Sequence, residues 1–159
     1  MKIPDFRQRF LVYLDILDVS FQRHLALICD VDSRDTVLLQ CCQYDDIPLI
    51  QWCINHGVDV NQCNCKGVWP WYVSAQEGHT KIVKLLLDNN ANSNKCTDAE
   101  ASPLFVACQK NHKEIVKLLL DKKADIDKCI NDGTSPLFIA KKANHIDIVR
   151  MLEEKGALE

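Results

Sequence analysis

The sequence has little net charge and no long apolar run, and each absence excludes a class of function. Its 159 residues carry a formal net charge of −3, so no long-range field would attract nucleic acid or an anionic membrane. No stretch approaches the roughly 20 apolar residues of a membrane-spanning helix. Pro4 and the interruptions at Asp15 and Asp18 disfavour a secretory signal peptide. We therefore predict an intracellular, cytoplasmic protein, with nuclear entry left open, that neither binds nucleic acid nor inserts into a membrane.

Motifs that carry common chemistries are also missing. The chain has no Gly-rich phosphate loop, no Gly-x-Ser-x-Gly elbow and no His-Glu-x-x-His motif. It does have nine cysteines, which we interpret as reduced thiols because no secretory signal is present. Cys63 with Cys65, and Cys41 with Cys42, form no Cys-x-x-Cys pair with a matching second half. The sequence therefore predicts no catalytic residue, no metal site and no cofactor.

What the sequence does contain is a repeat. Several columns of identical residues recur at intervals of 33 positions. The columns are Pro70, Pro103 and Pro136; His79, His112 and His145; Ile82, Ile115 and Ile148; Val83, Val116 and Val149; Leu86, Leu119 and Leu152; and Cys63, Cys96 and Cys129. One period held across so many columns indicates an array of stacked structural units. Equivalent residues of stacked units are too far apart to share a zinc ion or a disulfide, so the His and Cys columns predict neither.

Within one unit, the pattern predicts two short helices and a turn. Pro103 suits the first position of a helix, and Ser102 before it is a favourable N-cap. Ala107 and Cys108 are small enough to let a neighbouring helix approach closely.

The second helix of the unit is predicted to follow from Lys113. It places Ile115, Leu118 and Leu119 on one stripe at helical spacing. Gly67 and Gly133 mark the turns that follow the second helices, where a positive φ angle is expected.

The run SPLFVACQKNHKEIVKLLLDKKADID, residues 102–127, resembles an ankyrin repeat. That family's pattern has a TPLH start, a pair of small residues, then GH, IV, LL and a final GAD-N. The resemblance implies an all-α fold, a solenoid of stacked helix-turn-helix units with connecting β-turn fingers. Its four predicted units are 31–63, 64–96, 97–129 and 130–159. The first is divergent, with Val37 in place of Pro and Asp46 in place of His.

Residues 1–30 are predicted to form an N-terminal helical cap, which could be a degenerate repeat because Pro4 lies 33 residues before Val37. The alternative is an amphipathic helix that binds a partner or a membrane surface. At the other end, Lys141 and Glu153 replace small or apolar residues of the earlier units. These charges predict that unit 130–159 caps the array with a polar face.

No unit has a complete TPLH start, so the Thr-to-His hydrogen bond of the family cannot form. An apolar column replaces the His, and we predict that it packs between successive first helices. Its members are Leu39, Tyr72, Phe105 and Phe138. The resemblance further implies that the histidines of the 79, 112 and 145 column order the start of each second helix.

In ankyrin arrays the turn tips and the exposed face of the first helices form a concave groove that binds proteins. By register, the resemblance implies a partner-binding set in this chain. On the turns it comprises Asp32, Ser33, Asp35, Lys66, Val68, Trp69, Asp98, Ala99, Ala101, Asn131, Asp132 and Thr134; on the first helices it comprises Gln43, Tyr44, Gln76, Glu77, Gln109, Lys110 and Lys142. Trp69 and Tyr44 are candidate hot spots, whereas Trp71 stands at a core Leu position and should be buried.

The leading hypothesis is a non-enzymatic, intracellular interaction module, an adaptor or inhibitor that is monomeric alone and binds a protein or peptide in the groove. One alternative is that the chain is the recognition fragment of a larger multidomain protein. Another is a sensor of a small ligand or of oxidation, centred on the aromatic and Cys-rich unit 64–96. A fold-level resemblance indicates how such a protein binds and not what it binds.

Overall fold

Helices and loops make up the part of the chain that the computed structural model describes, residues 36–64 and 67–158. These ranges contain eight α-helices and no strand. The helices are α3 (Val37–Gln43), α4 (Ile47–Asn55), α5 (Pro70–Glu77), α6 (Thr80–Asp88), α7 (Pro103–Gln109), α8 (Lys113–Asp121), α9 (Pro136–Lys142) and α10 (Ile146–Glu154). The predicted all-α fold is therefore confirmed. The predicted cap at 1–30 lies outside the described residues.

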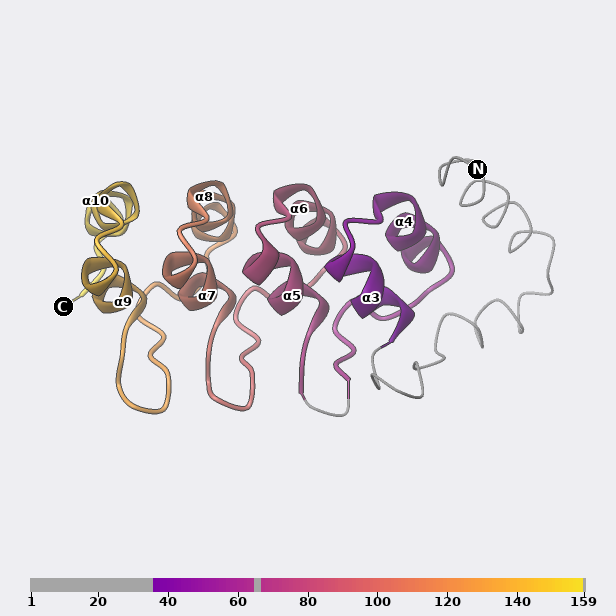
Figure 1. Ribbon diagram of the computed structural model, residues 1–159, viewed down its shortest axis with the longest axis horizontal. Helices are drawn as coiled ribbons and strands as arrows, with labels where there is room; N and C mark the ends of the chain where they lie inside the picture. The colour runs from indigo at the N-terminus through magenta and orange to yellow at the C-terminus, as the bar shows by residue number, and fades with distance from the viewer. Residues whose placement is uncertain (1–35, 65–66, 159) are drawn as a thin grey trace.

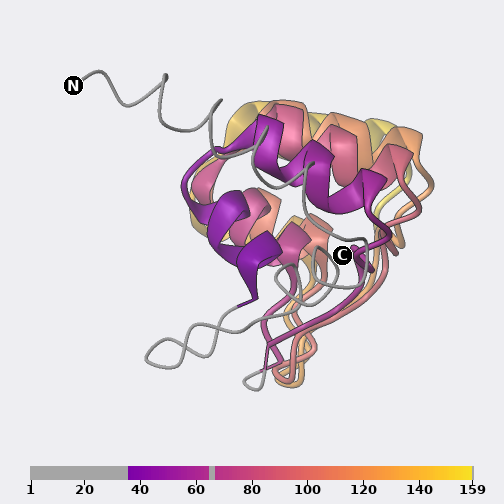
Figure 2. The same cartoon turned by 90° about the vertical axis from the view of Figure 1, so that its right-hand side faces the viewer.

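The helices form pairs that stack side by side along one axis (Figure 1). The first helices, α3, α5, α7 and α9, lie in one layer, and α4, α6, α8 and α10 lie in a second layer above it (Figure 2). Long loops between successive pairs all project from the same side of the stack, and we call these loops fingers. The predicted solenoid of helix pairs with connecting fingers is the observed architecture.

Side-chain caps fix where the first helices begin. The hydroxyl of Ser102 accepts a hydrogen bond from the backbone N–H of Phe105 at 3.1 Å, and Ser135 and Thr36 do the same for α9 and α3. Prolines occupy the first turn of α7 and α9, as predicted. A proline lacks the backbone N–H, and at this position an N–H would have no partner within the helix. The start of α5 follows Trp69, which has no capping oxygen. Each capping hydroxyl contributes about 1 kcal/mol.

The core is built from residues that repeat in register. Leu86, Leu119 and Leu152 are fully buried in the successive second helices. Ala107 and Cys108 are also fully buried where first helices pack together, so the prediction that small residues permit close approach is confirmed. Trp71 is buried as predicted.

The apolar column on the first helices behaves as predicted except at its last member. Leu39 and Phe105 are 3% and 4% exposed, and Tyr72 is partly buried against the core. Phe138 is 56% exposed, so the prediction that it packs between first helices is wrong. In the layer of first helices α9 packs beside α7, which carries Phe105, whereas no described first helix packs on the far side of α9, which carries Phe138.

Histidine side chains tie each helix pair to the one before it. The ring of His112 donates to the backbone oxygen of Gln76 at 3.1 Å, and that of His145 donates to the oxygen of Cys108 at 2.8 Å. His79 reaches Gln43 in the same way at 3.3 Å. These histidines stand at the N-cap positions of the second helices, but none of their side chains caps the helix. The histidine side chains therefore bond to the preceding pair and not to the start of their own helix.

The opposite edge of the stack carries a second set of bonds. The side-chain oxygens of Asn61, Asn94 and Asp127, spaced by 33 residues, each accept a hydrogen bond from the backbone N–H that lies 31 residues later. The donor–acceptor distances are 2.8–2.9 Å. We call this set the Asn/Asp ladder.

Lys123 occupies a backbone conformation that suits glycine. It ends α8 with φ of 59°, at the register position that is Gly57 and Gly156 in other pairs. The N–H groups of Lys123 and Ala124 bond back to Leu120 and Leu119, the pattern of a Schellman cap.

We expect Lys123→Gly to raise the free energy of unfolding by about 0.5–1 kcal/mol, because glycine adopts this conformation without steric cost. Urea denaturation followed by circular dichroism measures the change. Lys122→Gly, one residue earlier at a negative φ angle, is the control and should be destabilising. Stabilisation by both variants, or by neither, would contradict the assignment.

Candidate functional site

The predicted partner-binding residues lie along the ends of the first helices and on the fingers. Asp32, Ser33, Asp35 and Lys66 fall outside the described residues. None of the others is buried. The exposed ones are Gln43, Tyr44, Glu77, Asp98, Ala99, Gln109, Lys110, Asn131, Asp132 and Lys142, and the half-buried ones are Val68, Trp69, Gln76, Ala101 and Thr134. We call these described residues together the helix–finger surface.

The first-helix part of this surface follows directly from the helix ends. Gln43, Glu77 and Gln109 are the last residues of α3, α5 and α7. Their side chains stay in solvent while the small residues just before them, such as Ala75 and Cys108, are buried against neighbouring helices. Each helix pair therefore adds one short polar segment to a continuous row.

A backbone hydrogen bond closes the turn within each finger. The backbone N–H groups of Asn64, Thr97 and Ile130 donate to the backbone oxygens of Val68, Ala101 and Thr134, at 3.0, 3.1 and 3.1 Å respectively. The turns contain positive φ angles at Gly67 and Gly133, as predicted, and also at Glu100. Regular closure places the exposed finger residues at equivalent positions from one unit to the next.

Side chains also connect one finger to another. The carboxylate of Asp98 lies against the backbone of Gly67, where an added Cβ would be 2.6 Å from one of its oxygens. Lys128 forms an exposed ion pair of 3.1 Å with Glu100. The fingers thus form a connected surface.

The two aromatic candidates, Trp69 and Tyr44, differ in the exposure and the contacts of their side chains. The indole N–H of Trp69 donates to the backbone oxygen of Cys96 at 3.1 Å, and the ammonium of Lys95 lies 4.6 Å from the ring centroid. This cation–π contact and the hydrogen bond fix Trp69 to the next finger. Tyr44, in contrast, is 69% exposed. The better-exposed aromatic anchor of the helix–finger surface is Tyr44.

Charges of both signs lie on the helix–finger surface, with Glu77 and Lys110 both at the ends of first helices. Lys110 and Lys142 stand at the ends of α7 and α9, whereas Asp98 and Asp132 stand on fingers. Hydrogen bonds from the side chain and the backbone N–H of Thr134 hold the pKa of Asp132 below its usual range. The mixed sign agrees with a protein or peptide ligand better than with the uniformly basic footprint of nucleic-acid binders.

Cysteines are distributed between core and loops, with no disulfide among the described ones. Burial raises the pKa of the Cys42 thiol to about 12, and it raises the pKa of Cys108 as well, so both remain protonated and unreactive at neutral pH. Cys63 is half-buried, and Cys65 lies outside the described residues. In the described ranges, no group of three or more His, Cys, Asp or Glu residues is arranged to hold a metal ion.

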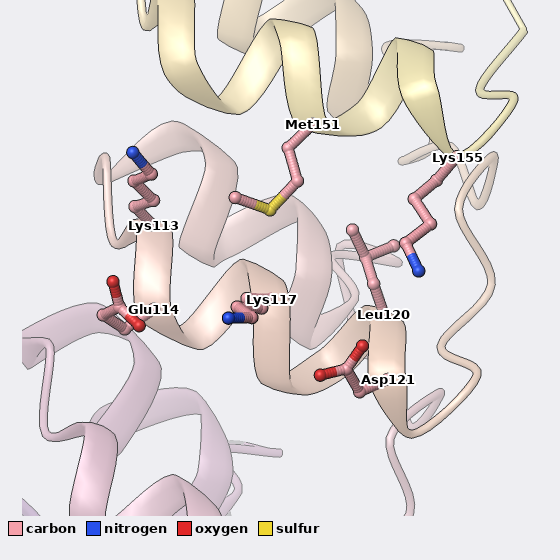
Figure 3. Close-up of a pocket in the computed structure, with 7 residues that line it drawn as sticks. All are labelled: Lys113, Glu114, Lys117, Leu120, Asp121, Met151 and Lys155. Carbon is pink, nitrogen blue, oxygen red and sulfur yellow. The ribbon is translucent and has the colours of Figure 1, made fainter.

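Sequence reasoning missed a hollow of about 310 Å³ on the opposite face, between α8 and α10. Figure 3 shows Met151 reaching from α10 toward α8, with Leu120 beside it as the other apolar lining residue. Lysines and acidic residues alternate around the rim, and one of them, Lys113, is paired with Asp147 at 3.1 Å. The sequence gives little indication of this hollow, because each lining residue also suits an ordinary solvent-exposed helix face.

No helix within the described ranges has the length and apolarity to cross a bilayer. The family model described as "Ankyrin repeats (3 copies)" matches residues 18–97 and 75–158. A search of curated proteins gave no match.

Proposed function

The chain belongs to the ankyrin-repeat family, whose repeats generally mediate protein–protein interactions, and from this premise we propose that it is a non-enzymatic adaptor or inhibitor. Its partner, a protein or peptide, would bind along the helix–finger surface. The observation that carries this proposal is the unbroken row of exposed polar side chains at the ends of the first helices, from Gln43 to Lys142, beside the fingers.

Several features of this row favour protein binding over a solvated structural face. The fingers are tied to one another through Asp98, Trp69 and Glu100, so little conformational entropy would be lost when a partner docks. The exposed ring of Tyr44 supplies an aromatic anchor of the type enriched in binding hot spots. Charges of both signs would set the orientation of the partner.

A charge-exchange variant tests the proposal. Glu77→Lys combined with Lys110→Glu alters the helix–finger surface without changing net charge. We expect a protein captured from cell lysate by the wild type to be reduced at least about tenfold with this variant, since reversed charges disfavour a partner matched to the original pattern. Quantitative mass spectrometry of the captured proteins provides the measurement.

The matched control is Glu114→Lys combined with Lys117→Glu on α8, which exchanges two exposed charges of the outer face. It should retain the partner. Loss of the partner with this control alone would place binding at the hollow between α8 and α10 and contradict the proposal. Circular dichroism confirms that both variants keep the helical content of the wild type.

A further inference from the structure

The helix pair α3 and α4 (Figure 1) has three cysteines in its core. Cys41 and Cys42 lie in α3, and Cys53 lies in α4. Their side chains are 4%, 0% and 0% exposed. No other described pair has more than one cysteine in its helices. The concentration of buried thiols in one pair is therefore a local feature and not a product of the repeat.

Two of these cysteines replace core residues of a different kind. The register equivalents of Cys41 are small and buried, and those of Cys53 are buried leucines. They are Ser74, Ala107 and Ala140 for Cys41, and Leu86, Leu119 and Leu152 for Cys53. These positions hold no sulfur in the other described pairs, so a dithiol across a helix pair is specific to α3 and α4.

The thiols of Cys41 and Cys53 contact each other across the pair. A hydrogen bond joins the two side chains, and the helices that carry them pack directly together. Cys42 points elsewhere, since its thiol is hydrogen-bonded to Ser74 of the next pair. Because the sulfurs of Cys41 and Cys53 already touch, a bond between them needs side-chain rotation and no rearrangement of the helices.

The hydrogen bond gives the two thiols different reactivity. The thiol of Cys41 donates to the sulfur of Cys53, which lowers the pKa of Cys53 against the opposing effect of burial. The same hydrogen bond, together with burial, raises the pKa of Cys41. Since the thiolate is the reactive form of cysteine, Cys53 is the nucleophile of the pair and Cys41 is the second thiol.

We propose that Cys41 and Cys53 form a reversible disulfide when hydrogen peroxide oxidises the protein. The sulfur of Cys53 attacks one peroxide oxygen, the O–O bond breaks, hydroxide leaves and a sulfenic acid forms. The sulfur of Cys41 then attacks the sulfur of Cys53, the S–O bond breaks, and a second hydroxide leaves as the S–S bond forms. The two thiol protons convert the hydroxides to water, and the peroxide gains the two electrons that the sulfurs lose.

The disulfide would fix one end of the helix–finger surface. Gln43 is the last residue of α3 and Tyr44 follows it directly, so a bond from Cys41 to α4 holds both against the second layer of helices. A short loop closed by a disulfide also stabilises the folded pair, because it restricts the unfolded chain. This inference goes beyond the proposed function, since the bond forms within the pair whatever partner binds.

Peptide mapping of the full chain tests the proposal. The folded protein is treated with hydrogen peroxide, its remaining thiols are alkylated in denaturant, and the chain is cleaved before each aspartate. Asp45 and Asp46 lie between Cys41 and Cys53, so this cleavage puts the two cysteines on separate fragments. We expect mass spectrometry to find these fragments joined through Cys41 and Cys53, and to find them separate after reduction with dithiothreitol.

Three variants provide matched controls. Cys41→Ala and Cys53→Leu install the residues found at the same register positions of α7 and α8, Ala107 and Leu119, so the fold should tolerate them. Each should abolish the link between the fragments. Cys42→Ala removes the neighbouring buried thiol and should retain the link.

Urea denaturation gives an independent readout. Oxidation should raise the urea midpoint of the wild type and of Cys42→Ala, reversibly with dithiothreitol, and should leave that of Cys53→Leu unchanged. The exposed thiol of Cys129 shows that the oxidant was active. The proposal is overturned if the fragments stay separate after Cys129 has been oxidised, if Cys53 bonds to another cysteine, if Cys42→Ala loses the link, or if the linked protein is no more stable than the reduced one.

Discussion

Gly78→Ala is expected to lower the free energy of unfolding by about 2–4 kcal/mol, because two costs combine at this position. Gly78 ends α5 with φ of 80°, which L-residues adopt only with strain. An alanine Cβ would also lie 2.5 Å from Cε1 and 2.8 Å from Nδ1 of His112. That ring is held in place by its hydrogen bond to Gln76, so relieving the clash would break the bond between two helix pairs. Urea denaturation followed by circular dichroism measures the loss.

Gly57→Ala separates the two costs. Gly57 has φ of 79°, and a Cβ added there meets no heavy atom within 4 Å. Only the backbone strain remains, so we expect a loss of about 1 kcal/mol. Equal losses for the two variants would show that His112 moves aside freely, and would contradict a linking role for the histidine.

Leu119→Ala is expected to cost about 3–4 kcal/mol, since it removes a fully buried side chain and leaves a cavity among neighbours from adjacent pairs. Leu119 is 1% exposed in α8, at the centre of the described array. Its neighbour Leu120 is only partly buried, so Leu120→Ala is the control and should cost about 1 kcal/mol. The same chemical unfolding experiment distinguishes the two.

The terminal pair offers a second comparison for this prediction. Leu152 is fully buried at the same register position in α10, but α9 and α10 contact a described helix pair on one side only. Because stability in repeat arrays is approximately a sum over neighbours, Leu152→Ala should detach the terminal pair first. Unfolding would then broaden into two steps. If Leu119→Ala and Leu152→Ala both unfolded in one sharp transition, the expected early detachment of the terminal pair would be contradicted.

The sequence predicts the helix pairs well because local rules and the repeat agree. Ser102 before Pro103 marks the start of α7 by both capping and φ preference, and the structure begins the helix there. The period of 33 residues carries that assignment to the other units, including α3, where Thr36 caps without a following proline.

The parts that could not be predicted depend on neighbours and not on local pattern. Phe138 has nearly the same sequence context as Phe105, and the two differ because α9 packs beside the helix that carries Phe105, whereas no described first helix packs on the far side of α9. Glu100 and Lys123 adopt positive φ angles where other units have glycine, because the register of the array dominates their intrinsic preference. Trp69 is fixed by a contact with the next finger, which no spacing within its own unit reveals. The described contact residues of the helix–finger surface are exposed or half-buried, and their role in binding remains a prediction.

The Asn/Asp ladder and the histidine bonds give the array a direction. In the ladder, a side chain of one unit accepts from the backbone of the unit that follows. At the other edge, the histidine of the following unit donates back to the backbone of the one before. A substitution in the ladder therefore disturbs the neighbour toward the C-terminus, whereas a substitution at a histidine disturbs the neighbour toward the N-terminus. The structural effects of substitutions at the two edges of the stack would therefore spread toward opposite ends of the chain.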